Sequence, residues 1–222
     1  MPNSTRAALL DLIATHSFKL GDFTLASGQK SDYYIDCRTT TLHAEGGRLS
    51  GLVFYELIRE HMPHAVAVGG LTMGADPLVS NTASASAWAL AEYIETLELS
   101  TELEIEDEDP GLPPTLIHGF LVRKAEKTHG TGRRVEGFLQ PGAHVVIVDD
   151  VCTTGGSTIT AIESTREAGM IVAGVLCLVD REQGGRDNIE RALAEVPADE
   201  IVPFHSVFTA SDVRRAHLAL KS

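Results

Sequence analysis

The feature that most constrains the fold is the stretch VVIVDDVCTTGGST, residues 145–158, where an apolar run gives way to two adjacent carboxylates, then to hydroxyls and glycines. The first four residues are all β-branched, and an uninterrupted run of this kind is typical of a strand buried on both faces of a parallel sheet. We therefore expect a strand that ends at Asp149, inside an α/β sheet covered by helices.

The segment after this strand has the pattern of a loop followed by a helix. TITAIESTREAG has helical apolar spacing and a glycine stop at Gly169, and Ser157 or Thr158 is a suitable N-cap. Ligands of open α/β sheets bind at such junctions, beyond the carboxyl ends of the strands. A glycine-rich turn at a helix N-terminus also offers converging backbone N–H groups to a phosphate.

The side chains of this junction indicate a sugar phosphate as the ligand. The hydroxyls of Thr153, Thr154, Ser157 and Thr158 can donate to the same anion as the backbone. Asp149 and Asp150 would repel a phosphate at close range, so they suit the ribose hydroxyls instead. A surface strand end with two solvated aspartates would explain either acid alone, but the whole pattern favours a ligand site.

Other phosphate and nucleophile motifs do not fit these residues. A Walker loop needs a Lys after its last glycine, and a dinucleotide fingerprint needs G-x-G-x-x-G spacing where this chain has the adjacent pair Gly155 and Gly156. A phosphatase with an aspartyl nucleophile would carry a second Asp where Val151 stands. Cys152 has no positioned base near it in the sequence, which favours a small apolar filler over a thiol nucleophile.

The rest of the chain supports a Rossmann-like sheet with helices on both faces. Further strands are expected at HAVAVGG, LIHGFLV, GVLCLVD and EIVPFHSVF, and helices at about 45–61 and 76–94. A second glycine-rich loop, Gly70 to Gly74, follows one of these strands. It is either an ordinary tight turn or another wall of the same crevice.

The net charge of −13 is unevenly spread over the 222 residues. Residues 92–109 hold nine acidic and no basic side chains, and we interpret this block as an exposed loop or hairpin that acts as a solvated spacer. Between 123 and 134 the sign reverses, so a polyanionic ligand would meet its positive potential there. The basic residues of that segment are Arg123, Lys124, Lys127, Arg133 and Arg134.

Length and composition are consistent with a single-domain cytoplasmic protein. The length fits one domain, 1–222, because no Pro- or Ser-rich linker divides it. NSTRAALLDLIATHS predicts a short amphipathic helix capped by Ser4 or Thr5 instead of a signal peptide, and no apolar run approaches membrane length. The three cysteines have no paired spacing, which predicts a reducing cytoplasm, and metal-site spacings such as HExxH are absent.

On these residues the chain resembles the type I phosphoribosyltransferases, whose loop for phosphoribosyl pyrophosphate (PRPP) has an apolar strand, Asp-Asp and then Thr-Thr-Gly-Gly-Ser. FTLASGQKSDYYIDCR, residues 23–38, is similar to the N-terminal segment of orotate phosphoribosyltransferases, and GFLVRKAEKTHGTGRRVEG, residues 119–137, to their mobile catalytic loop. The matches run from about residue 18 to about residue 185. The implied fold has a mostly parallel central sheet flanked by helices, a small N-terminal hood and a mobile catalytic loop at about 123–137, with an acidic insertion at about 95–114.

For PRPP the resemblance implies a site that extends along the crevice. Asp149 and Asp150 would hold the ribose hydroxyls, the loop from Thr153 to Ser157 would cradle the 5-phosphate, and the Gly70 to Gly74 loop would face the pyrophosphate. The basic loop would close on the pyrophosphate, with Gly130 and Gly132 giving it flexibility; a solvated charged segment is the alternative. The residues assigned to PRPP are Arg123, Lys124, Lys127, His129, Asp149, Asp150, Val151, Cys152, Thr153, Thr154, Gly155, Gly156 and Ser157, with Lys127, Asp149 and Asp150 as the catalytic candidates.

Orotate would lie against Tyr33, Tyr34, Ile35 and Thr153, with its carboxylate met by Arg181. Such an Arg is usually a surface residue, but this one follows LCLVD on the ligand side of the sheet. As the bond to pyrophosphate breaks, negative charge develops on the leaving group, and the basic loop and Mg²⁺ would stabilise it. The cation would be carried by PRPP near the two aspartates, without a directly assigned protein ligand. The ring nitrogen of orotate would then attack, giving orotidine monophosphate in pyrimidine biosynthesis.

The resemblance also implies a homodimer with shared active sites and no nucleic-acid or membrane partner. The basic loop lies on a long excursion, Glu95 to Gly137, whose glycines and prolines predict weak anchoring to its own sheet. Two positions depart from the family, because many members have Lys where this chain has Ala26 and Met73. Two alternatives remain: a phosphoribosyltransferase for another base, and a PRPP-sensing regulatory protein, which would need a basic face that this acidic chain lacks.

Overall fold

The computed structural model describes residues 2–24, 28, 30–102, 112–124, 134–195 and 202–221. Its main sheet has the strand order β5-β4-β3-β6-β7-β8, and all neighbours run parallel except β5, which pairs antiparallel with β4. The mostly parallel sheet expected from the sequence is therefore confirmed. Its strands are β3 (Ala67–Leu71), β4 (His118–Val122), β5 (Val135–Gly137), β6 (His144–Cys152), β7 (Ile171–Asp180) and β8 (Phe204–Thr209).

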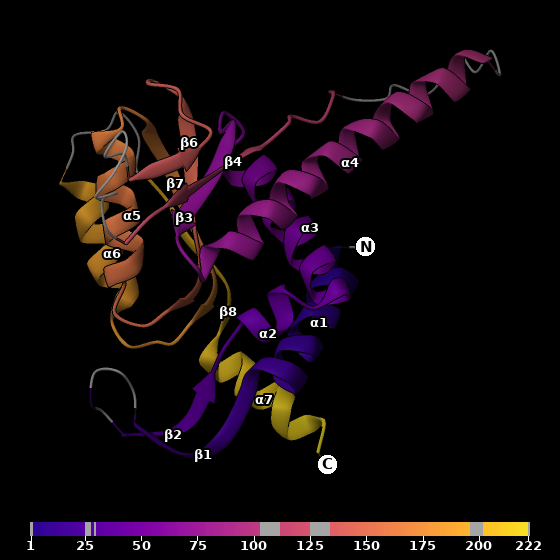
Figure 1. Cartoon of the computed structure of the whole chain (residues 1–222). Helices are drawn as coiled ribbons and strands as arrows, with labels where there is room; N and C mark the ends of the chain where they lie inside the picture. Colours follow the sequence, from indigo (N-terminus) through magenta and orange to yellow (C-terminus); the bar gives the residue numbers. More distant parts are fainter. Residues whose placement is uncertain are drawn as a thin grey trace.

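Helices cover both faces of this sheet (Figure 1). One face carries α3 (Ala44–His61) and α4 (Ala75–Glu102), and the other carries α5 (Gly156–Glu167) and α6 (Gly185–Ala194). Along β6, Val146 and Val148 enter the first core while Val145 and Ile147 enter the second. Both faces of the strand are buried, and this is why its sequence has no polar alternation.

The N-terminal region forms the expected hood. It contains α1 (Pro2–Leu12), the π-helical turn η1 (Ile13–Ser17), and an antiparallel pair, β1 (Phe18–Thr24) and β2 (Lys30–Ile35), that is separate from the main sheet. Two short elements complete it, α2 (Arg38–Thr41) and the C-terminal α7 (Ala210–Ala219). Figure 1 shows β1 and β2 beside α7 at one end of the molecule. The end of β2 is thereby brought to the crevice of the main sheet.

The long helix α4 corrects the interpretation of residues 92–109 as a loop or hairpin. The helix was expected to end near Ile94, but it continues to Glu102, so the first four acidic residues of the block are helical. The sequence has no Gly or Pro between 95 and 109, and Leu and Glu are good helix formers, so nothing stops the helix there. Residues 103–111 lie outside the described part of the chain.

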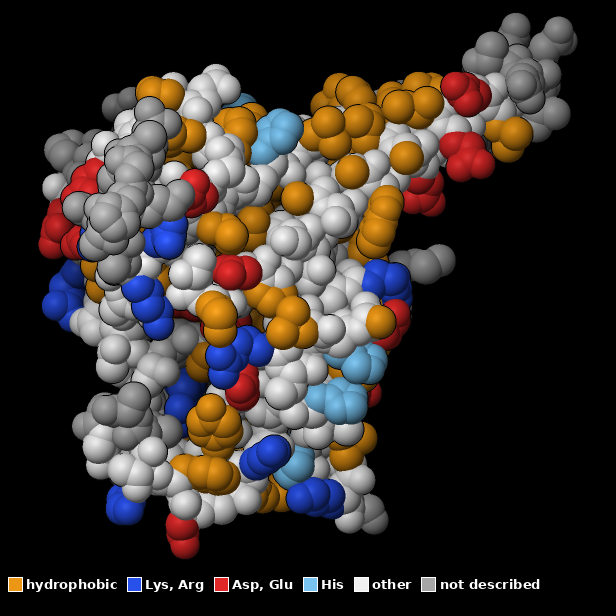
Figure 2. Space-filling view, viewed as in Figure 1, with side chains coloured by type: hydrophobic (Ala, Val, Ile, Leu, Met, Phe, Trp, Pro, Cys, Tyr) orange, Lys and Arg blue, Asp and Glu red, His pale blue; other side chains and the backbone are white. Residues whose placement is uncertain are grey.

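The outer part of α4 presents apolar side chains to solvent. Trp88, Ile94 and Leu99 are 59%, 47% and 56% exposed, and Figure 2 shows apolar side chains gathered along the projecting helix. No helix in the described ranges is long and apolar enough to cross a membrane.

Two further expectations about element boundaries are wrong. Helix α1 begins at Pro2, ahead of the suggested Ser4 or Thr5 cap, because Pro is well tolerated in a first turn. Strand β6 continues beyond Asp149 to Cys152, because it goes on pairing with β7. Within the excursion from Glu95 to Gly137, the described residues include the end of α4 and the strands β4 and β5. Residues 125–133 of the basic loop lie outside the described residues, so its weak anchoring stays a prediction.

Candidate active site

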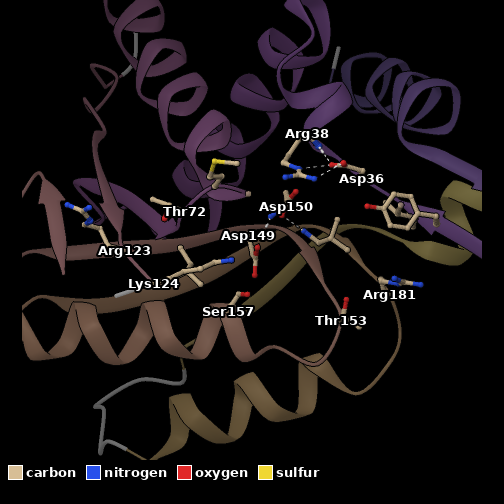
Figure 3. Close-up of a pocket in the computed structure, with 16 residues that line it drawn as sticks. Asp36, Arg38, Thr72, Arg123, Lys124, Asp149, Asp150, Thr153, Ser157 and Arg181 are labelled. Carbon is tan, nitrogen blue, oxygen red and sulfur yellow. Dashed lines mark hydrogen bonds and ion pairs between the residues drawn. The ribbon is translucent and has the colours of Figure 1, made fainter. Parts of the chain in front are cut away.

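The crevice lies where the chain reverses its direction of winding across the sheet. From β3 the chain crosses through α4 to β4, and from β6 it crosses through α5 to β7 on the other side. Ligands of open α/β sheets bind at such a switch point, outside the carboxyl ends of the two strands. A cavity of about 650 Å³ opens there, between the hood, the sheet and the loops that follow β3, β4, β6 and β7 (Figure 3).

Two adjacent carboxylates lie at the centre of the cavity. Asp149 is buried, and its Oδ2 accepts a hydrogen bond of 2.6 Å from the Thr158 hydroxyl. Burial, and then the charge of Asp150, raise the pKa of Asp149 to about 7. Burial also raises the pKa of Asp150, against the lowering effects of the Val151 N–H and the Arg38 charge. Hydrogen bonds donated by sugar hydroxyls would therefore stabilise this buried pair of carboxylates.

The loop after β6 leads directly into a helix N-terminus. Gly155 has a left-handed φ of 83° and is the N-cap of α5, with no side-chain capping bond. The expected cap, Ser157 or Thr158, is therefore wrong: the Thr158 hydroxyl is used by Asp149, and Ser157 lines the cavity with Thr153. The first N–H groups of α5 thus lack a side-chain cap, as a phosphate-binding turn requires.

Val151 lines the cavity, whereas two other loop residues assigned to PRPP, Cys152 and Thr154, support this turn from behind. Cys152 is buried and borders Gly185, where an added Cβ would lie 2.4 Å from its sulfur, so its predicted role as a filler is confirmed. The Thr154 carbonyl accepts a hydrogen bond of 2.9 Å from Asn188 of α6. These two residues shape the turn without lining the cavity.

The basic loop is described only at its base. Arg123 and Lys124 line the cavity at the end of β4. The Arg123 N–H donates to the Arg134 carbonyl at 2.9 Å, which closes the base of the loop between β4 and β5. Residues 125–133, with the predicted ligands Lys127 and His129, lie outside the described residues.

The hood and the end of β7 form the other end of the cavity. Tyr34 and Ile35 line it, whereas Tyr33 stacks on Phe18 and lies 4.8 Å beneath the Arg181 guanidinium. Arg181 is only 6% exposed, and its buried Nε has no hydrogen-bond partner in the described structure. A buried guanidinium with an unused N–H suits a planar carboxylate.

Comparison with known proteins agrees with this geometry. A family model described as the phosphoribosyl transferase domain matches residues 121–203. The orotate phosphoribosyltransferase of Aquifex aeolicus is 39% identical over 211 residues, which cover 94% of this chain and 97% of that protein. The chain belongs to the orotate phosphoribosyltransferase family. That of Synechocystis is 38% identical over 96% of this chain and 90% of its own length.

Solved structures of orotate phosphoribosyltransferases share the fold. The Mycobacterium tuberculosis enzyme in complex with Fe(III) dicitrate has a TM-score of 0.69 and 33% identity, covering 94% of this chain and 98% of that one. The same enzyme in complex with PRPP has a TM-score of 0.63 and 27% identity, covering 95% and 92%. The mixed α/β fold with a largely parallel sheet is therefore that of the type I phosphoribosyltransferases.

Asp36 and Arg38 line the cavity as an ion pair that was not assigned from the sequence. Thr72 and Met73 line it from the Gly70 to Gly74 loop, so that loop is a wall of the crevice. An added Cβ at Gly74 would lie 2.3 Å from Asp150 Oδ1, so the loop passes directly over the carboxylate. The signal for the ion pair was present, since Asp36 and Arg38 end the matched N-terminal segment.

Proposed function

We propose that the chain transfers the phosphoribosyl group of PRPP to orotate, giving orotidine 5′-monophosphate and pyrophosphate in de novo pyrimidine synthesis. The observation that carries the proposal is the order of charges along one cavity. The buried Arg181 lies at one end, the Asp149 and Asp150 carboxylates at the centre, and the uncapped α5 N-terminus and the base of the basic loop at the other side. Relatives named orotate phosphoribosyltransferase support it over most of the chain.

In this proposal each group of residues binds or stabilises one part of the substrates. The turn from Thr153 to Ser157 binds the 5-phosphate, and Asp149 and Asp150 accept hydrogen bonds from the ribose hydroxyls. Arg181 holds the orotate carboxylate, so the ring nitrogen is oriented toward the anomeric carbon. As the bond to pyrophosphate breaks, the electron pair goes to the leaving oxygen, and Lys124 with the residues of the basic loop stabilises that charge.

The donors present in the crevice fit a magnesium ion that arrives with PRPP. Among the described residues, no group of three or more His, Cys, Asp or Glu side chains could hold a metal ion by itself. Mg²⁺ is commonly bound through one or two carboxylates together with substrate phosphates and water. Asp149 and Asp150 are the carboxylates of the crevice that could contact the ion, and the bound cation would neutralise charge on the leaving pyrophosphate.

The proposal includes a homodimer in the cytoplasm. The exposed apolar side chains of α4, Trp88, Ile94 and Leu99, offer a surface for a second copy, and the base of the catalytic loop lies at the edge of the sheet. All three cysteines are free and buried, which fits a reducing compartment.

The test is an absorbance assay for loss of orotate in the presence of PRPP and Mg²⁺. Uracil, adenine and hypoxanthine are run in parallel, each with release of pyrophosphate as the readout. We expect turnover with orotate alone, because only orotate carries a carboxylate for Arg181. Turnover of hypoxanthine or adenine with orotate inert would overturn the assignment.

A further inference from the structure

Arg38 is a cation in the cavity to which the proposed mechanism gives no role. It begins α2, directly after the β2 strand of the hood. Its Nε and Nη2 each donate to one oxygen of Asp36 at 2.8 Å, and the Arg38 backbone N–H donates to Asp36 Oδ1 at 3.1 Å. Asp36 therefore fixes the plane of the guanidinium, because a two-pronged contact leaves it little freedom to rotate.

The guanidinium still has donors to offer. Its side chain is 43% exposed and lines the cavity, whereas Asp36 is 24% exposed. Among the described residues, Nη1 of Arg38 has no hydrogen-bond partner. An arginine that is anchored on one edge and open on the other is arranged to bind a second anion.

The position of Arg38 indicates which part of the substrate that anion is. Figure 3 shows Arg38 next to Asp150, and its charge favours the ionised form of that carboxylate. The Gly70 to Gly74 loop passes over the same carboxylate, as the close approach of Gly74 to Asp150 shows. The cavity-lining part of this loop, Leu-Thr-Met-Gly, carries no charge. Arg38 thus supplies the positive charge on the wall where the loop itself supplies none.

The other described cations that line the cavity are either distant from this wall, already paired, or too few to balance the charge of a pyrophosphate. The described lining residues include four cations, Arg38, Arg123, Lys124 and Arg181. Arg181 lies over Tyr33 at the opposite end, and Arg123 is paired with Glu136 at 3.4 Å. A pyrophosphate group carries several negative charges, and Lys124 alone would balance only one of them.

We propose that Arg38 binds the pyrophosphate part of PRPP and stabilises it as the leaving group, with Asp36 as the residue that positions the guanidinium. The inference rests on the proposed function for the identity of the substrate. When the anomeric C–O bond breaks, its electron pair stays on the pyrophosphate oxygen, and the free N–H groups of Arg38 face the charge that forms. No proton transfer from Arg38 is involved, since a guanidinium stays protonated.

The test compares binding of Mg²⁺-pyrophosphate and of orotate to the full chain by calorimetry, together with steady-state kinetics. For Arg38→Ala we expect the Kd of Mg²⁺-pyrophosphate and the KM of PRPP to rise about tenfold or more, and kcat to fall, while the KM of orotate changes less than about twofold. Arg38→Lys should recover part of the pyrophosphate affinity, because it keeps the charge and loses the two-pronged anchor. Asp36→Asn should give a smaller loss than Arg38→Ala.

Arg181→Ala is the matched control, an arginine of the same cavity for which we expect the reverse pattern. Unchanged pyrophosphate affinity in Arg38→Ala, or equal losses for pyrophosphate and orotate, would overturn the inference. If Arg38→Ala does not fold, as judged by its melting temperature, Arg38→Lys and Asp36→Asn decide the question. A wild-type chain that binds PRPP but uses another base would refute the proposed function and leave the Arg38 result standing.

Discussion

Arg181 is the residue that we propose to distinguish a base with a carboxylate from a neutral one. Its backbone N–H is tied to the Cys152 carbonyl at 2.8 Å, and the next residue, Glu182, has a left-handed φ of 59° and accepts hydrogen bonds from Ser211. The turn after β7 is therefore held from both sides. A guanidinium placed this firmly loses little further entropy when it binds a ligand.

Replacing this side chain tests its role directly. Arg181→Ala should weaken orotate binding by about 2–5 kcal/mol, because the orotate carboxylate would then be buried without a partner. The Kd of PRPP should change much less, since its phosphates lie elsewhere in the cavity. Isothermal titration with each substrate measures both effects. Equal losses of affinity for orotate and PRPP would indicate a purely structural role.

The raised pKa of Asp149 predicts that the stability of the protein depends on pH. The pKa of Asp149 rises from 3.8 to about 7 on folding, so the native state keeps a proton at pH values where the unfolded chain has lost it. The free energy of unfolding should therefore fall as the pH rises from about 4 to about 7, by up to about 1.4 kcal/mol for each unit by which the pKa is raised. Above about pH 7 it should stay level. Asp149→Asn should raise the melting temperature at pH 8 and not at pH 4, while activity is lost.

Asp36→Asn is the control of opposite sign. The hydrogen bond from Arg38 lowers the pKa of Asp36 below 3.8, so this carboxylate stabilises the native state above that pH and ceases to do so in acid. The variant should lose stability at pH 8 and resemble the wild type at low pH. If both variants shift the melting temperature in the same direction at pH 8, the electrostatic explanation fails.

Single residues were predictable from the sequence where a local pattern defines them. Asp149, Asp150, Thr153 and Ser157 follow one another along the chain, so the order of strand, loop and helix was enough to place them in the cavity. The contact of Thr158 with Asp149 and the approach of Arg38 to Asp150 depend on side-chain direction and on the docking of the hood. Such contacts have no periodic signal in the sequence.

At the scale of elements, the start of α5 depends on a glycine that touches the neighbouring helix. A Cβ at Gly155 would lie 2.9 Å from Ile189 Cγ1 and 3.0 Å from the Gly185 carbonyl, and its φ of 83° is left-handed. The close contacts and the left-handed backbone both disfavour a side chain at this position. The turn can therefore pack against α6 only with glycine at this position.

Gly155→Ala should destabilise the protein by about 2–4 kcal/mol, from the left-handed backbone together with the overpacking against α6. Gly156→Ala is the matched control, because a Cβ there has nothing within 4 Å and Ala is the better helix former. Its free energy of unfolding should stay equal or rise slightly. Urea unfolding curves of the two variants provide the comparison. Similar losses in both would show that the contact with α6 is not the cause.

The elements themselves were largely predictable, and their ends were not. The buried strands and the helix pattern of residues 158–169 gave the correct order, because each buries an apolar face of the right period. The acidic residues do not mark the end of α4, because Glu is compatible with a helix when no glycine or proline intervenes. The end of β6 has no local signal, because the length of the strand depends on its partner β7.

At the scale of the whole molecule, the described base of the basic loop lies at one edge of the sheet. β5, the strand that follows the loop, is the outermost strand of the sheet and pairs with β4. An edge position makes the loop accessible to a neighbouring copy. We therefore keep the prediction that the active form is a homodimer in which the loop of one subunit completes the site of the other.

Mixing two inactive variants tests this arrangement. One carries Lys127→Ala on the loop, and the other carries Asp149→Asn with Asp150→Asn in the sugar site. If the loop acts on the partner's site, a heterodimer has one site with both defects and one with neither, so activity should return toward half of the wild-type value per heterodimer. If the loop acts on its own site, every site keeps a defect. Subunit exchange is verified separately with differently tagged chains, and exchange without any recovery of activity would exclude the shared site while leaving the orotate assignment untouched.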